Sequence, residues 1–483
     1  MGRNRPLAWI GLAVLAAAAA ARNLPHLAPG MLNWAEPGNV AAALAGGRGF
    51  SDPFDGGTGA TAWVSPLPVL VDALVFLVFG TKSHASAVVL LCLCVGALAA
   101  ANALLDSALR SYGPWMQGAA CAAFLGYCVL VPGGPLEVLS EAPLDILLSV
   151  VLLWAGLGMG PYPPRRKCAG LLAAAFLAPL ENAGVALAVC AALVLLAWRT
   201  RQDRGGLALP LAAAAACALA VLGWAARNES ALGHPIPNKS NFWFELHLAN
   251  VDAPEGLPRV ENVLRRLPFF DVREFSRYAA LGEIRYVDSF RAPAAAAIRA
   301  NPLHFAGNVL RRAGDALVFC RRDGGAEHTD FHFAVGDWAR LVRAGELITT
   351  GNGGGVWTRI DAPPFSEKLK LESLGLSDPR GVEADWARCR LSYDQANFGL
   401  GGMFLGYATA GIPFAAILIS AFLLGGRLPA PGAWAAGISL CMLIPYVLVN
   451  HNERHQLPLI AMQAVALGSL AQAVRARLRP SGP

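Results

Sequence analysis

Carboxylates and basic residues stand at the ends of several long apolar runs in this sequence. The first is Glu36, which follows an apolar run at residues 7–21 and opens a polar, glycine-rich loop. Arg48, Asp52 and Asp55 lie in the same loop. A carboxylate can deprotonate or orient an incoming hydroxyl group. Arg or Lys can stabilise the charge that develops on a leaving phosphate. The pattern therefore indicates acid–base and anion chemistry beside a membrane.

Later turns between apolar runs carry the same residue types. The candidates there are Glu141, Arg227, Lys239, Asn241, Glu245, Glu453 and Arg454, with Asp145, Glu181, Asn182 and His455 as further polar neighbours. Solvation in a loop explains any one of them. Solvation does not explain why so many of them occur together, because ionisable side chains at the ends of membrane spans are costly and usually functional.

The composition predicts a membrane protein. The 483 residues are 55% hydrophobic and 15% charged, whereas soluble domains carry roughly 25% charged residues. Ten apolar runs are spread over the chain, which predicts an all-α polytopic fold with about ten transmembrane helices. The net charge of +6 comes from arginines in short loops between these runs, so we interpret it as a topology signal and expect no nucleic-acid partner.

Positive charge predicts the side of the membrane on which each loop lies. Arg3 and Arg5 favour a cytoplasmic N-terminus, and Arg165 and Arg199 fall on that same side only if the segment 66–79 does not cross. That segment is short for a span and contains Pro66. We therefore expect 66–79 to be an interfacial helix, both termini to be cytoplasmic, and the candidate residues to gather on the outer face.

Three parts of the chain follow from this topology. Residues 1–226 form an N-terminal transmembrane module with a first outer loop at 23–84, residues 227–397 form a mixed extracytoplasmic region, and residues 398–483 form the C-terminal transmembrane helices. Cys320 and Cys389 lie in the outer region, either as a pair or as two free thiols. The glycine run 351–355 lacks the Lys-Ser/Thr of a phosphate-binding loop, so we expect a flexible loop there.

The first outer loop resembles a known family. The segments 36–54 (EPGNVAAALAGGRGFSDPF) and 58–68 (TGATAWVSPLP) are similar to those of bacterial family 39-like glycosyltransferases of the GT-C superfamily, which includes protein O-mannosyltransferases and aminoarabinose transferases. Three later segments agree with it in order: SEAPL at 140–144, WAARN at 224–228 with IPNKSNFWFEL at 236–246, and ERHQLP at 453–458. The resemblance covers roughly residues 30–290 and 445–475.

The resemblance implies a membrane glycosyltransferase in a bacterial inner membrane, with its active site facing the periplasm. A polyprenyl-phosphate-linked sugar would be the donor, and a lipid, glycan or protein outside the cytoplasm would be the acceptor, with inversion at the sugar. The implied catalytic or metal-coordinating carboxylate is Glu36, and Glu141 is a second catalytic candidate because of its place in an outer turn. The implied phosphate contacts are Arg454 together with Lys239 or Arg227. Arg48 is a further phosphate-binding candidate, and Asp52, Asp55, Asn241, Glu245 and Glu453 are supporting candidates.

The chain also departs from the family pattern. Ala35 stands where many members have an acid before the glutamate, and His455 and Gln456 stand where Tyr and Arg are usual. The sequence therefore leaves open whether a divalent metal ion takes part as a cofactor. Two alternatives also stay open. One is a transporter or flippase of a polar lipid or solute, and the other is an inactive GT-C relative that acts in envelope assembly.

Overall fold

The computed structural model describes most of the chain, with gaps. The described residues are 5–23, 35–54, 56–130, 136, 142–157, 164–202, 206–258, 266–268, 272–318, 348–350, 355–357, 413–426, 429–450 and 453–478. Two predicted site residues, Asp55 and Glu141, lie outside this set, as do Cys320 and Cys389.

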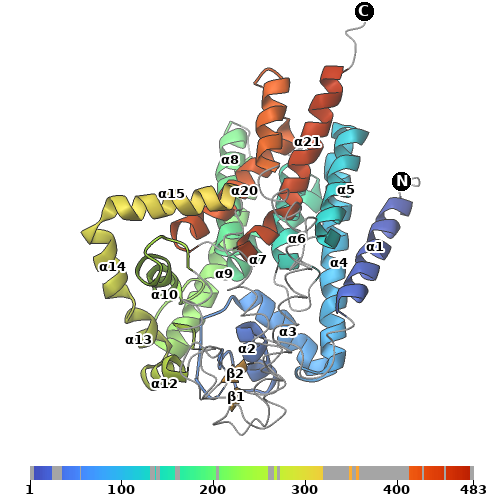
Figure 1. The fold of residues 1–483 in the computed structure, drawn as a ribbon. Coiled ribbons are helices and arrows are strands. Elements are labelled where there is room, and N and C mark those ends of the chain that lie inside the picture. Colours follow the sequence, from blue (N-terminus) through green and yellow to red (C-terminus); the bar gives the residue numbers. More distant parts are fainter. Residues whose placement is uncertain are drawn as a thin grey trace, which may run out of the picture.

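The described chain is almost entirely helical (Figure 1). The longer helices are α1 (Arg5–Asn23), α4 (His84–Leu109), α5 (Pro114–Leu130), α6 (Ala142–Gly156), α7 (Arg165–Glu181), α8 (Ala183–Thr200), α9 (Ala208–Leu232), α15 (Pro302–Val318), α20 (Ala430–Leu448) and α21 (Ile460–Leu478). The shorter elements are α2 (Ala35–Ala45), α3 (Pro66–Phe79), α10 (Phe242–His247), α12 (Val272–Leu281), α13 (Glu283–Asp288), α14 (Arg291–Ala300), the π-helical turn Leu248–Asp252 and the 3-10 turn η4 (Glu453–Leu459).

A 3-10 turn, η2 (Arg110–Tyr112), follows α4, and two short strands, β1 (Ile348–Thr350) and β2 (Gly355–Trp357), pair antiparallel. The strands lie in the region that the sequence predicts to be mixed in structure.

Among the residues that the structure describes, five helices are long and apolar enough to cross a membrane. They are His84–Tyr112, Ala183–Thr200, Ala208–Leu232, Ala430–Leu448 and Leu457–Leu478. Shorter apolar helices occupy four more of the predicted runs, at Ile10–Ala21, Pro114–Leu130, Ala142–Gly156 and Pro413–Leu423. The remaining run, 168–180, lies within α7. The helical class is confirmed, and the number of ten spans stays a prediction.

The segment 66–79 is a helix with the predicted bounds. Pro66 and Pro68 occupy its first turn, where proline costs no hydrogen bond, and Gly80 ends it with φ +95°. At 1.5 Å per residue, 14 residues reach about 21 Å, which is less than the hydrocarbon thickness of about 30 Å. The length of α3 thus agrees with the prediction that this segment does not cross, and its place at an interface stays a prediction.

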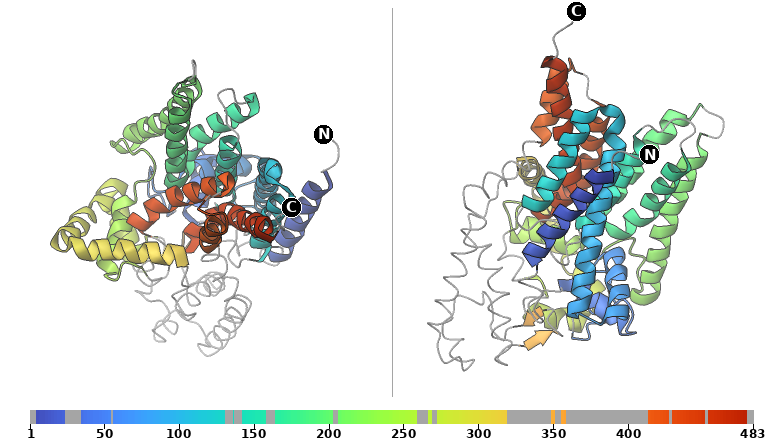
Figure 2. Two further views of the ribbon diagram at one scale, coloured as in Figure 1. Left: turned by 90° about the horizontal axis from the view of Figure 1, so that it is seen from above. Right: turned by 90° about the vertical axis from the view of Figure 1, so that its right-hand side faces the viewer.

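The two ends of the helical bundle are different. The helix α1 begins and α21 ends at one end, whereas α2 and α3 lie at the opposite end, which we name the α2/α3 end (Figure 1). The helices α10 and α12–α14 lie beside one flank of the bundle, and α15 runs across the long axes of its helices (Figure 2). The side of a membrane on which each end lies stays a prediction.

Two apolar cores hold these parts together. The larger one lies between the bundle helices and includes Leu98, Phe124 and Leu153. The smaller one lies under the first loop and is built on an aromatic cluster that consists of Phe54, Trp63, Phe244, Tyr278, Tyr286 and Phe290. Edge-to-face contacts such as Phe54–Tyr278, with centroids 4.8 Å apart, fix the loop against α10, α12 and α13.

Candidate functional site

A polar cluster lies where α6 begins and where α7 and α20 end, and it includes one residue of η4. We define it as Asp145, Asn182, Tyr446 and His455. The side-chain Nδ2 of Asn182 donates to Asp145 Oδ2 over 2.8 Å and to the Tyr446 hydroxyl over 2.6 Å. The ring of His455 stacks on that of Tyr446, with centroids 3.8 Å apart. The cluster therefore presents a carboxylate, an amide, a phenol and an imidazole together.

Local sequence explains how Asn182 comes to this place. Asn182 is extended, with φ −150° and ψ 130°, so α7 ends at Glu181 and α8 begins at Ala183. Its Oδ1 accepts a hydrogen bond from the backbone of Gly184 over 2.7 Å, which caps α8. A Cβ at Gly184 would lie 2.5 Å from the carbonyl of Met442, so only glycine lets α8 approach α20 this closely. That approach brings Tyr446 to Asn182.

Both carboxylates of this region are buried. Asp145 is 5% exposed in the first turn of α6, and Glu181 is 3% exposed at the end of α7. Buried carboxylates at the ends of apolar helices are costly and usually functional. Sequence reasoning noted both residues but did not select them for the site.

The segment after α9 connects the cluster to the first loop. Asn238 Nδ2 donates to the carbonyl of Pro179 over 2.6 Å, and the backbone of Ser240 donates to the carbonyl of Ala62 over 2.8 Å. Lys239 lies between them and is half-buried. This predicted phosphate contact therefore lies between the end of α7 and the first loop.

Arg227 holds the first loop against α9. Its guanidinium donates to the carbonyls of Phe50 and Thr61, each over 2.7 Å, and to Asn228 over 2.9 Å. It also lies over the Phe50 ring, 5.1 Å from the centroid. The structure thus gives this predicted phosphate contact a clear structural task.

The predicted residues of the first loop also stabilise one another. Asp52 is buried, has φ +60°, and accepts hydrogen bonds from Arg48 over 2.7 Å and from the backbone of Gly59 over 2.9 Å. These contacts close a turn at the bridge between Ser51 and Ala60. Arg48 is half-exposed, and its pairing with Asp52 shapes the loop.

Glu36 lies in the first turn of α2 and is half-buried. The helix is tied to its surroundings by Asn39, which donates to the carbonyl of Pro53 over 3.0 Å and accepts from Lys82 over 2.6 Å. Glu36 is thereby held on a helix that is fixed to the first loop and to the chain after α3.

Asn241 and Glu245 form a second link to α20. Asn241 Nδ2 lies 3.3 Å from Glu245 Oε1, and Asn450 Nδ2 donates to Glu245 Oε2 over 2.6 Å. Asn450 follows the end of α20, one turn after Tyr446. Glu453 and Arg454 belong to η4, which also carries His455, but their side chains lie outside the described part of the structure.

Glu283 is a buried carboxylate beside the first loop, and the sequence does not mark it as a site residue. Glu283 is 3% exposed and accepts hydrogen bonds from the Thr61 hydroxyl, from the backbone of Ala62 over 2.7 Å and from the Tyr278 hydroxyl over 2.7 Å. Burial raises the pKa of Glu283, although these hydrogen bonds oppose the shift. Its only sequence signal is its place at the start of α13, which many solvent-exposed glutamates share.

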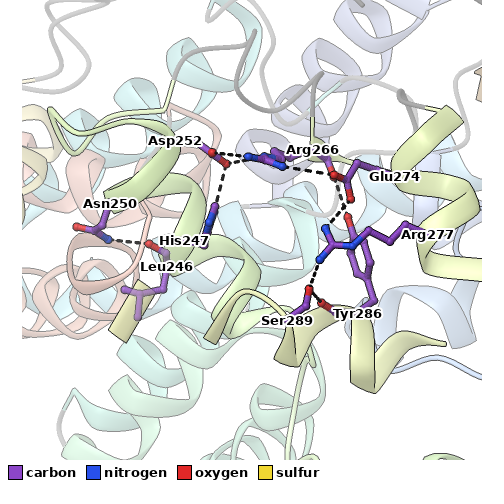
Figure 3. A network of polar contacts seen from close by, with 9 residues as sticks. All are labelled: Leu246, His247, Asn250, Asp252, Arg266, Glu274, Arg277, Tyr286 and Ser289. Atoms are coloured by element: carbon purple, nitrogen blue, oxygen red, sulfur yellow. Dashed lines mark hydrogen bonds and ion pairs between the residues drawn. The ribbon is translucent and has the colours of Figure 1, made fainter. Parts of the chain in front are cut away.

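A network of ion pairs connects α10 with α12 and α13 (Figure 3). Asp252 lies 3.2 Å from His247 Nδ1 and 3.0 Å from Arg266, which also reaches Glu274. Burial alone would raise the pKa of Asp252, but the hydrogen bonds from His247 and Arg266 outweigh burial and lower it. Arg277 extends the network from Glu274 to Ser289, over 3.2 and 2.6 Å. The network fixes the outer flank of the molecule.

The described residues do not fit a metal site held by the protein. Within the part of the chain that the structure describes, no group of three or more His, Cys, Asp or Glu side chains converges closely enough to hold an ion. The polar cluster offers only one carboxylate and one imidazole beside an amide and a phenol, which is a poor ligand set for Zn²⁺ or Mg²⁺.

Comparison with protein-family models, with curated proteins and with solved structures gives no match to this chain.

Proposed function

We propose that this chain is a polytopic glycosyltransferase of the GT-C type in a bacterial inner membrane. It moves a sugar from a polyprenyl-phosphate carrier to an extracytoplasmic acceptor. The observation that carries the proposal is the buried Asp145, which Asn182 links to Tyr446. Polar groups that converge among apolar helices are expensive and mark functional sites. The resemblance of the first loop to GT-C enzymes supplies the reaction class.

Sugar transfer needs a general base, a cation that contacts the leaving phosphate, and a site that is shielded from water. An acceptor hydroxyl attacks the anomeric carbon from the face opposite the phosphate, so the carbon–oxygen bond to the carrier breaks and the configuration inverts. The polyprenyl phosphate leaves with the electron pair, and the hydroxyl proton passes to a carboxylate. Glu36 or Asp145 takes that role in the proposal.

Basic residues near the cluster stabilise the leaving phosphate. Arg454 precedes His455 in η4, and Lys239 lies between two residues that contact the end of α7 and the first loop. Arg can bind phosphate oxygens with two donors, and Lys contributes a point charge. Arg227 keeps the loop in place instead, because its donors are directed to backbone carbonyls.

The direct test uses the full chain in lipid nanodiscs with radiolabelled polyprenyl-phosphate sugars and a membrane extract. Label should move to an acceptor, and the variant that removes the base, Asp145→Asn or Glu36→Gln, should slow transfer by about 100-fold or more. The matched control is Asp106→Asn, because Asp106 bonds Arg110 at the other end of α4, away from the first loop. It should transfer sugar like the wild type.

A negative result is also informative. If no sugar moves under any divalent-ion condition, the glycosyltransferase proposal fails. Movement of the intact labelled lipid across a sealed vesicle would instead support the flippase alternative. If transfer occurs but both variants remain fully active, the assignment of Glu36 and Asp145 is wrong and the reaction class stands.

A further inference from the structure

The helix α15 has its polar and apolar faces reversed relative to a helix of a soluble protein. Asn308 and Arg312 are buried against the rest of the chain, at 1% and 0% exposure. Leu303, Leu310 and Leu317 are 84%, 72% and 42% exposed. Soluble amphipathic helices bury the apolar stripe and expose the polar one. The apolar face of α15 is therefore left uncovered by the rest of the chain.

The polar face of α15 is firmly docked. The ring of His304 and the amide of Asn308 both reach the carbonyl of Pro254, over 2.7 and 3.1 Å, and Arg311 donates to the carbonyl of Glu255. Gly256 has φ +87°, and a Cβ there would lie 2.6 Å from Asn308. The close fit shows that this face packs against the chain. The leucines lie on the opposite side of α15 and therefore point outward.

Arg312 attaches α15 to the end of α20. Its guanidinium donates to the carbonyls of Val447 over 2.7 Å and Leu448 over 3.3 Å, and to those of Ala249 and Gly256 over 3.3 and 3.0 Å. The last carbonyls of a helix carry a partial negative charge that favours a cation. Burial lowers the pKa of Arg312 to about 10, so it stays charged at neutral pH.

The leucine stripe lies on a helix that is attached to a candidate membrane span. The three leucines are spaced seven residues apart, which places them along one side of the helix. α20, to whose end α15 is attached, is long and apolar enough to span a membrane and exposes Leu440, Ile444 and Leu448.

We propose that α15 is a lipid-facing helix, whose leucine stripe contacts the acyl chains of the bilayer beside the end of α20. Its orientation across the bundle axis matches a helix that lies in the membrane plane (Figures 1 and 2). The inference concerns lipid contact alone and stands whether or not the chain transfers a sugar.

Lipid contact at α15 has a consequence for the polar cluster. Val447 and Leu448, whose carbonyls Arg312 holds, directly follow Tyr446. The bilayer therefore restrains the helix end that presents Tyr446 to Asn182. A lipid-borne substrate that diffuses along this flank would meet α15 before it reached the cluster.

The test places an environment-sensitive fluorescent amino acid at position Leu310 of the full chain by codon suppression. The protein is reconstituted, at about one chain per vesicle, into phosphatidylcholine with or without brominated acyl chains. Bromine quenches only fluorophores within the hydrocarbon region. The matched control position is Ala280, which is exposed on α12. We expect quenching at Leu310 to exceed that at Ala280 by about threefold or more.

Equal quenching at the two positions would overturn the proposal. If the probe at Leu310 is unquenched but becomes shielded at high protein-to-lipid ratio, a second copy of the chain covers the stripe and the proposal is also wrong. A second probe at Leu303 gives an independent reading if the first variant does not fold, and it is subject to the same two outcomes.

Discussion

The side-chain amide of Asn182 donates a hydrogen bond to the carboxylate of Asp145 across 2.8 Å. This bond connects the start of α6 with the turn between α7 and α8. The second N–H of the same amide is directed to the Tyr446 hydroxyl on α20. One residue thus orients a buried carboxylate and a half-buried phenol at once.

Replacement of Asn182 should impair catalysis more than folding. Asn182→Ala removes both donors and the cap of α8, so we expect transfer to slow by about 100-fold and the free energy of unfolding to fall by about 1–3 kcal/mol. The matched control is Ser83→Ala, because Ser83 caps α4 with a 3.0 Å bond to Ser86. It should cost about 1 kcal/mol and leave transfer intact. Equal activity of the two variants would contradict the role of Asn182.

Arg227 should act through stability. Arg227→Gln removes a cation that holds two carbonyls of the first loop, so we expect a loss of about 2–3 kcal/mol in thermal unfolding and faster proteolysis of the loop. Arg48→Gln serves as the control, because Arg48 is half-exposed and its loss should cost less than about 1 kcal/mol. An Arg227→Gln protein with wild-type stability but weaker donor binding would instead support the phosphate contact that the sequence predicts.

Glu283 should make the contact between the first loop and α13 depend on pH. Burial raises the pKa of this carboxyl in the folded protein, so the folded state keeps a proton that the unfolded chain has already released. The stability that this proton contributes is complete below the usual glutamate range near pH 4.5 and is lost as pH rises through the raised value. The free energy of unfolding of the wild type, measured from pH 4.5 upward, should fall as this proton is released. The Glu283→Gln variant should not show this fall. A variant with the same pH dependence as the wild type would rule out Glu283 as the source.

Gly256 should be required for the docking of α15. Gly256→Ala adds a Cβ that would lie 2.6 Å from Asn308, at a φ of +87° that side chains rarely adopt. Gly282→Ala is the matched control, because Gly282 also has a positive φ, of +73°, but has open space around its added Cβ. We expect backbone strain to lower the free energy of unfolding by about 1 kcal/mol in both variants. At Gly256 alone, overpacking should cost a further amount of about 1–3 kcal/mol. Thermal unfolding of the two variants measures the difference, and equal losses would contradict the close contact.

The sequence alone determined the local features of this protein. Apolar length and proline placement predicted α3 with its bounds, Pro66–Phe79, because helix formation depends on neighbouring residues and on the capping signals beside them. The ten apolar runs likewise predicted where helices form. The sequence also pointed to the turns that carry Asp145, Asn182 and His455, because polar residues between apolar runs are visible without a fold.

Only the tertiary structure decided which of these residues meet. Asn182 is 37 residues from Asp145 and 264 from Tyr446, and Glu283 is 222 residues from Thr61. No local sequence pattern shows that residues so far apart in the chain come into contact. The approach of α8 to α20 depends on the absence of a side chain at Gly184 and on packing across the bundle. The sequence likewise does not show which groups the cation Arg227 contacts. Only the folded loop supplies the two carbonyls that hold it.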